Sequence, residues 1–276
     1  GGDRAAVARD LYREGLIPTP QQQGYHSHTR RPGMWSYEQD GSVTGGEIVS
    51  PVMRDTPEAW RQIERVCEIV RRHGGQATHR CGLHVHVGSA PLDTSARRWY
   101  RLVRVAGGYE DVLFRIAAGG SSGGEHRGAH RGYGYARPGL ALRVRPQMPI
   151  SPAAAGATEQ VIHRVLSPGG HYEAVNASGH FSRGTVEFRH FDGTLDPAQI
   201  QAYVKVANGV VQAAQRLRSA RAEAALPDRG MPVGSGASGA DPEHRAVRRF
   251  LDTIFGRTRD KAHLLWLYAT SRWQPA

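Results

Sequence analysis

Apolar residues recur along much of the chain at the i, i+3, i+4, i+7 spacing that is typical of amphipathic helices. This spacing predicts helices over residues 3–15, 57–73, 93–117, 157–166, 197–218, 242–256 and 259–270. Thr56 and Pro57 strengthen the second helix, because Thr is a good N-cap and Pro is tolerated in the first turn. Gly107 and Gly108 predict a break in the third helix. Residues 119–158 show no such spacing and are expected to be mostly irregular.

Two other segments alternate between apolar and polar residues, which is typical of half-buried strands. They read CGLHVHVG over residues 81–88 and GTVEFRHF over residues 184–191. A third strand region surrounds Asp40-Gly41, a hairpin signal, and its returning strand carries Glu47. The order from residue 35 to residue 88 is strand, helix, then the strand with the two histidines.

Polar side chains that could bind a metal or carry a proton fall on one face of each of these strands. Successive strand side chains point to opposite faces, so His84 and His86 share a face and Val85 lies on the other. In the same way, Glu187 and Arg189 are presented together. A bare His-x-His pair fits solvated or hydrogen-bonded histidines as well as metal ligands or proton carriers. The other two strands favour the functional interpretation.

The chain is strongly basic, with a net charge of +11 that comes almost wholly from arginine, since Lys205 and Lys261 are the only lysines. The arginines are spread along the chain rather than gathered in dense patches with aromatic residues, so nucleic acid is not the expected partner. A solvated basic surface is the simpler interpretation, and attraction of an anionic ligand is the alternative. No Gly-Lys-Ser/Thr sequence exists, which excludes a Walker phosphate loop.

Two cysteines, Cys67 and Cys81, are too few for a disulfide framework. No apolar run approaches the roughly 20 residues that span a bilayer. The first residues lack the apolar core of a secretory signal. A cytoplasmic protein without a membrane partner is the expectation.

The three strands together carry a chemically coherent set of side chains. Oxygen and nitrogen ligands without thiolates suit Mg²⁺ or Mn²⁺ better than Zn²⁺. Magnesium binds through a few carboxylates together with substrate phosphates, and arginine beside such a carboxylate is a natural phosphate partner. The residue types therefore indicate metal-dependent phosphoryl or nucleotide chemistry.

Three motifs in this order, DGSVTGGEIVSPV, CGLHVHVG and GTVEFRHFDGTL, resemble the amidoligase family, carboxylate–amine ligases related to glutamine synthetase. The resemblance covers about residues 1–215. It implies an α+β protein with a glutamine-synthetase-like catalytic fold, in which a curved antiparallel sheet has the site on its concave face and helices on its convex face. The implied organisation is a catalytic domain over residues 1–220, a flexible linker over 221–241 and a helical extension over 242–276. The family usually opens with a GxExE strand, which this sequence does not contain.

The resemblance also assigns roles to individual residues. Those implied as ligands of Mg²⁺ or Mn²⁺ are Glu47, His84 and Glu187. Those implied to contact the ATP phosphates or the transferred phosphoryl group, and to act in catalysis, are His86 and Arg189. Those implied to contact nucleotide or substrate are Arg131, Tyr133, Asn176 and Arg183. Arg131 and Tyr133 belong to the basic segment EHRGAHRGYGYARP, for which a surface loop and a loop closing over an anion are equally compatible with the sequence.

The implied activity is ATP-dependent formation of an amide or peptide bond through an acyl phosphate. The partners would be a small-molecule or peptide carboxylate and an amine, and the sequence leaves a homo-oligomer open. Two alternatives remain. One is a metal-dependent hydrolase that uses the same histidines and carboxylates, and the other is a non-catalytic basic binding protein.

Overall fold

The computed structural model describes residues 2–25, 31–78, 80–117, 136–145, 147–227, 240–255 and 261, with the backbone alone for 240–244. Two compact units divide the chain. Unit 1 comprises Gly1–Cys81 and Gly193–Gln201, and unit 2 comprises Gly82–Asp192 and Ala202–Ala276. Both combine helices with small antiparallel sheets, which confirms the α+β class. No helix in the described ranges has the length and apolar character needed to cross a membrane.

Unit 1 packs two helices against a two-stranded hairpin. Its elements are α1 (Arg4–Arg13), β1 (Ser36–Glu38), β2 (Glu47–Val49) and α2 (Pro57–Arg72). Thr56 caps α2 as the sequence predicts, because its hydroxyl accepts a hydrogen bond from the backbone N–H of Ala59. The core gathers side chains from both helices and from β1: Val7, Ala8, Leu11, Trp35, Tyr37, Val66 and Ile69.

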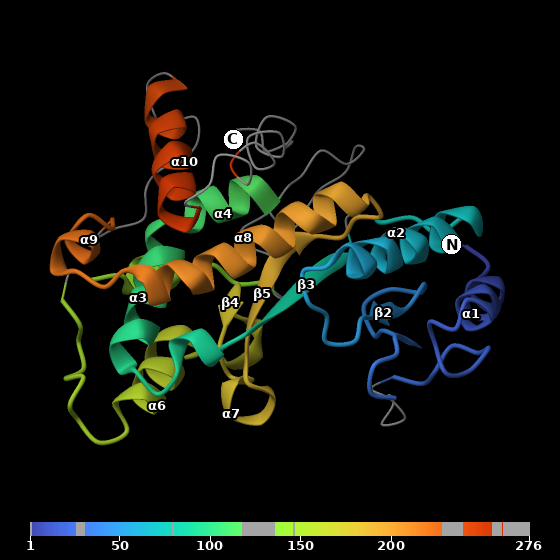
Figure 1. Ribbon diagram of the computed structural model, residues 1–276, viewed down its shortest axis with the longest axis horizontal. Helices are drawn as coiled ribbons and strands as arrows, with labels where there is room; N and C mark the ends of the chain where they lie inside the picture. Colours follow the sequence, from blue (N-terminus) through green and yellow to red (C-terminus); the bar gives the residue numbers. More distant parts are fainter. Residues whose placement is uncertain are drawn as a thin grey trace. The chain divides into compact units, whose positions relative to one another are not determined.

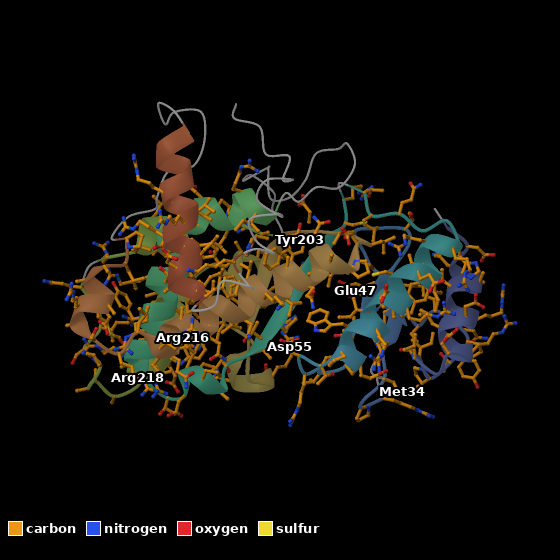
Figure 2. The ribbon with its side chains drawn as sticks, turned by 45° about the horizontal axis from the view of Figure 1, so that its top comes forward. Met34, Glu47, Asp55, Tyr203, Arg216 and Arg218 are labelled. Atoms are coloured by element: carbon orange, nitrogen blue, oxygen red, sulfur yellow. The ribbon has the colours of Figure 1, made fainter. Side chains whose placement is uncertain are left out.

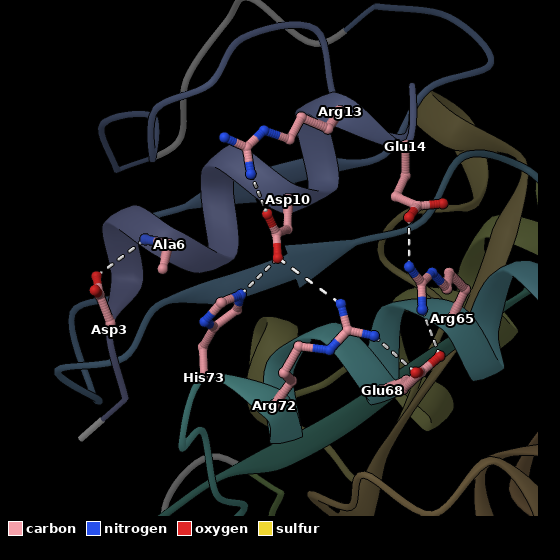
Figure 3. Close-up of polar contacts among 9 residues, drawn as sticks. All are labelled: Asp3, Ala6, Asp10, Arg13, Glu14, Arg65, Glu68, Arg72 and His73. Atoms are coloured by element: carbon pink, nitrogen blue, oxygen red, sulfur yellow. Dashed lines mark hydrogen bonds and ion pairs between the residues drawn. The ribbon is translucent and has the colours of Figure 1, made fainter.

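Charged contacts join α1 to α2 above this core (Figure 3). The Asp10 carboxylate lies 2.7 Å from Nε2 of His73, and Arg65 pairs with Glu14. The pKa of Asp10 is lowered mainly by its hydrogen bond with His73. These pairs fix the facing sides of the two helices, although their exposure limits what each contributes to stability.

The returning segment of unit 1 is attached to its first part by backbone contacts. Gly193 donates from its backbone N–H to the Cys81 carbonyl at 3.1 Å. Nη1 of Arg71 donates to the Leu195 carbonyl at 2.9 Å. Residues that lie more than a hundred positions apart in sequence therefore complete one unit.

Unit 2 contains a three-stranded antiparallel sheet in the order β3–β5–β4. The strands are β3 (Gly82–Gly88), β4 (Val175–Asn176) and β5 (Thr185–Asp192). Its helical elements are η1 (Ala90–Leu92), α3 (Ala96–Gly108), α4 (Glu110–Ala117), α5 (Leu140–Arg143), α6 (Ala157–Val161), η2 (Ile162–Leu166), η3 (Gly170–Tyr172), α7 (His180–Arg183), α8 (Pro197–Arg216, in unit 2 from Ala202), α9 (Ala220–Ala224) and α10 (Ala240–Ile254) (Figure 1).

Helices α3, α4, α8 and α10 share a core with the apolar side of this sheet. Val85, Val186 and Phe188 supply the strand side of the core, as their alternation predicts. Phe191 stacks on Tyr203 of α8, with ring centroids 4.5 Å apart. The helices thus cover one side of the sheet and leave the polar residues of β3 and β5 on the other.

Several sequence predictions differ in detail from these elements. The predicted helix over 93–117 is divided into α3 and α4 next to Gly107 and Gly108, as expected. In the described part of the region 119–158, which was expected to be irregular, α5 is helical and α6 begins at Ala157, and α9 occupies part of the predicted linker 221–241. Residues 228–239 and the predicted helix 259–270, except Lys261, lie outside the described residues.

Candidate functional site

The pairing of β3 with β5 brings the predicted site residues of unit 2 together. His86 lies directly opposite Glu187, and Val85 lies opposite Phe188. The register then shifts, so that Arg189 and His190 of β5 together oppose the single residue His84. This bulge is where the alternation of β5 breaks. The Arg189 side chain lies with His84 and Glu187, whereas His190 packs among aromatic rings of the core.

The Glu187 carboxylate is the centre of this polar cluster. Its Oε1 atom accepts a hydrogen bond from Nη1 of Arg189 at 2.5 Å. The same oxygen lies 3.3 Å from Nδ1 of His84 and 3.6 Å from Nε2 of His86. Glu187 and Arg189 are nearly buried, with side chains 10% and 11% exposed, which strengthens their ion pair. The two histidines are more open, at 27% and 38% exposed, so the cluster is reachable from solvent.

This donor set suits a divalent cation. Its residue types, one carboxylate and two imidazoles, are those that bind Mn²⁺ or Zn²⁺ and, with water, Mg²⁺. In the structure Arg189 supplies the positive charge at Glu187. Within the described ranges, no group of three or more His, Cys, Asp and Glu side chains is arranged to hold a metal ion. The assignment of His84 and Glu187 as metal ligands therefore stays a prediction.

Glu47, the third predicted metal ligand, lies on β2 of unit 1 (Figure 2). It stands opposite Glu38 of β1 in the antiparallel register, and Glu38 is almost fully buried. Two acidic residues directly opposite each other repel unless a positive charge or a proton intervenes. Glu38 is a candidate site residue that the sequence analysis did not single out. The only signal was its place in the strand that precedes the Asp40-Gly41 turn.

Asn176 lies opposite Glu187 on β4, so it stands directly beside the cluster in the sheet. Its side chain is buried and is used within its own loop. Nδ2 donates to the Gly170 carbonyl at 2.7 Å, and Oδ1 accepts from the backbone N–H of Ser178 at 2.7 Å. These bonds fix the loop next to the site, which suits a supporting role better than the predicted direct contact with substrate.

The remaining predicted site residues are Arg183, Arg131 and Tyr133. Arg183 is exposed in α7, just before β5. Arg131 and Tyr133 lie outside the described residues. Thr185, which the sequence analysis did not single out as a site residue, lies within 3.4 Å of Nδ1 of His86 through its hydroxyl. The strand alternation placed Thr185 on the correct face, which was a usable signal.

Comparison with known protein families agrees with the sequence motifs. Residues 12–119 match a family described as "Putative amidoligase enzyme". The matched range includes Glu47, His84 and His86 and ends before β5. A search among curated proteins found no match. The match supports an amidoligase assignment and agrees with the first two motifs, whereas the third motif, which carries Glu187 and Arg189, lies beyond the matched range.

Proposed function

Because its first motifs match the amidoligase family, we propose that this chain is an ATP-dependent carboxylate–amine ligase. The observation that carries the proposal is the cluster on the solvent-accessible side of β3 and β5, in which one carboxylate oxygen meets Arg189, His84 and His86. We also infer that the β3–β5–β4 sheet is part of the curved, glutamine-synthetase-like sheet of the family.

The proposed reaction has two steps. A carboxylate oxygen of the first substrate attacks the γ-phosphorus of ATP, the bond to the bridging oxygen breaks, and an acyl phosphate and ADP form. The amine nitrogen then attacks the acyl carbon, phosphate leaves, and the nitrogen loses a proton to give the amide. The Arg189 guanidinium would stabilise negative charge on the transferring phosphoryl group.

Other residues would prepare the site for this charge. Glu187 holds Arg189 in place, and His84 and Glu187 would supply the ligands for Mg²⁺ or Mn²⁺ in this unit, while the role of Glu47 in unit 1 as a metal ligand stays a prediction. When bound, the cation would neutralise phosphate oxygens. His86, positioned by Thr185, would contact a phosphate oxygen through its imidazole.

Substitution of Glu187 tests the proposal. We expect Glu187→Gln to abolish Mn²⁺ binding, measured by electron paramagnetic resonance, and to lower ADP release at least 100-fold with ATP, amino acids and ammonia. Glu159→Gln is the matched control, because Glu159 is exposed on α6 of the same unit. Full Mn²⁺ binding and ADP release in Glu187→Gln would contradict the site assignment.

The same measurements separate the alternatives. Tightly held zinc together with amide hydrolysis in the absence of ATP would favour the hydrolase. Retention on nucleic acid that falls steeply with salt, without ATP binding, would favour a basic binding protein. Either result would overturn the ligase.

A further inference from the structure

A cavity lined by arginines lies within unit 2 and shares no residue with the β3–β5 cluster. Its volume is about 260 Å³, which is below the usual size of pockets for drug-sized ligands. The residues that line it come from α3, from the segment after α5 and from α9: Arg97, Tyr100, Arg101, Arg104, Gln147, Met148, Pro152 and Glu223. Figure 1 shows α9 beside the region of α3.

Three arginines on one face of α3 dominate the cavity. Arg97, Arg101 and Arg104 are spaced four and three residues apart, so they lie along one side of the helix. Arg101 and Arg104 are largely buried, which is rare for arginine unless its charge is compensated. The sequence analysis left attraction of an anionic ligand open as an explanation of the excess arginine. This face is where that excess is concentrated inside the fold.

Compensation of these charges is incomplete. Glu223 is the only acid among the described residues that line the cavity, and it is shared by Arg97 and Arg101. Arg97 binds it with a fork, Nε to Oε1 at 3.1 Å and Nη2 to Oε2 at 3.2 Å. Burial acts to raise the pKa of Glu223, but the hydrogen bonds from Arg97 and Arg101 outweigh it and leave the pKa lowered. Glu223 is thus a carboxylate whose one negative charge is shared by two of the three guanidiniums.

Arg104 does not reach the carboxylate. Its Nη1 and Nη2 donate to the backbone carbonyls of Glu223 and Leu226, at 2.7 Å and 3.1 Å. Its Nε atom is buried without a hydrogen-bond partner in the described part of the chain, in a residue that is only 5% exposed. A buried guanidinium with an unused N–H and no carboxylate of its own is costly, so the positive charge of the arginines that line the cavity exceeds the negative charge that compensates it.

The cavity also has an apolar side, formed by the Tyr100 ring, Met148 and Pro152. The Tyr100 hydroxyl is turned to backbone carbonyls, at 2.7 Å from that of Gln147, so its ring is the part left for a ligand. We propose that this cavity binds a small oxyanion, a carboxylate or a phosphate, that carries an apolar group. The oxyanion contacts the α3 arginines, with Glu223 as an internal competitor for the same guanidiniums.

Because Glu223 competes with the anion for the arginines, two substitutions are expected to change the affinity for the anion in opposite directions. The probes are phenyl phosphate and phenylacetate, which share a ring and differ in the anionic group, with benzyl alcohol as the neutral analogue. Binding to the full chain is measured by isothermal titration calorimetry in EDTA. Arg97→Gln is expected to weaken binding of the preferred anion at least fivefold, because it removes a donor. Glu223→Gln is expected to tighten it at least fivefold, because it removes the competitor.

Two control variants separate this cavity from other basic sites. Arg98→Gln changes a neighbouring arginine that does not line the cavity and donates to the Pro91 carbonyl instead. Arg164→Gln changes an exposed arginine of η2 in the same unit that does not line the cavity either. Both are expected to leave anion binding unchanged. If circular dichroism shows that Glu223→Gln is unfolded, the affinities of Arg97→Gln and Arg98→Gln for the anion decide whether the proposal holds.

Several results would overturn the proposal. They are an unchanged affinity in Arg97→Gln, a weakened or unchanged affinity in a folded Glu223→Gln, loss of binding in Arg164→Gln, and equal binding of benzyl alcohol. Preference for phenyl phosphate over phenylacetate, or the reverse, identifies the anionic group of the natural ligand.

Discussion

Acidification is expected to destabilise unit 2 through His190, on the inward side of the β5 bulge. The residue is fully buried, and its ring centroid lies 4.2 Å from that of Phe191 and 5.6 Å from that of Phe114. Nδ1 lies 3.4 Å from the Ala174 carbonyl, and Nε2 has no hydrogen-bond partner in the described part of the chain. Burial lowers the pKa of His190 to about 4.

The sign of the effect follows from this lowered pKa. The folded protein favours neutral His190, whereas the unfolded chain takes up a proton near the ordinary pKa of about 6.5. Stability from this residue is complete above pH 6.5 and is lost as the pH falls from 6.5 to 4. The full loss corresponds to about 3 kcal/mol, and about 2 kcal/mol is lost by pH 5.

Urea unfolding of the wild type and of His190→Phe at pH 8, 7, 6 and 5 measures this contribution. Phenylalanine keeps an aromatic ring in the core and removes the titrating group. We expect the difference in unfolding free energy between the two proteins to change by about 2 kcal/mol from pH 8 to pH 5, in favour of the variant at low pH. His171→Phe, at an exposed position, is the control. Parallel pH dependences of the wild type and His190→Phe would refute the reasoning.

Two further substitutions test the packing of the units by urea unfolding. Gly46 has a φ of +103°, and an added Cβ would lie 2.5 Å from the Glu38 carbonyl oxygen, so we expect Gly46→Ala to cost about 1–3 kcal/mol. Gly33→Ala, with a φ of +78° and open space, should cost less, and equal losses would contradict the close approach. Tyr203→Phe removes a buried hydrogen bond to the Ala117 carbonyl at 2.9 Å and should cost about 1 kcal/mol. A neutral result would show that this bond contributes nothing.

Local signals in the sequence predicted most of the elements. The Thr56 cap and the apolar spacing after it define α2, and the alternation of β5 correctly places Val186 and Phe188 in the core. Such signals depend on neighbouring residues alone, so they can be read without knowing the fold. Tyr12 fits the apolar spacing of the first helix but is 46% exposed, because helical spacing does not fix the width of the buried stripe.

The bulge in β5 could not be predicted in this way. Strict alternation from Glu187 and Arg189 would place Phe191 on the polar side, whereas Phe191 lies opposite Leu83 and is fully buried. The extra residue arises from pairing with β3, about a hundred positions earlier in the chain. For the same reason, the sequence predicted that Glu187 and Arg189 share a face but not that Arg189 and both histidines meet at one carboxylate oxygen.

The division of the chain has a consequence for its synthesis. The polypeptide leaves unit 1 after Cys81 and returns to it only at Gly193, where the bond from the Gly193 N–H to the Cys81 carbonyl joins the two parts. A ribosome must therefore add more than a hundred residues before unit 1 has all of its own chain. A fragment that stops at Cys81 lacks the Leu195 carbonyl that Arg71 binds. Expression of unit 1 alone thus calls for a designed link between its two segments rather than a simple truncation.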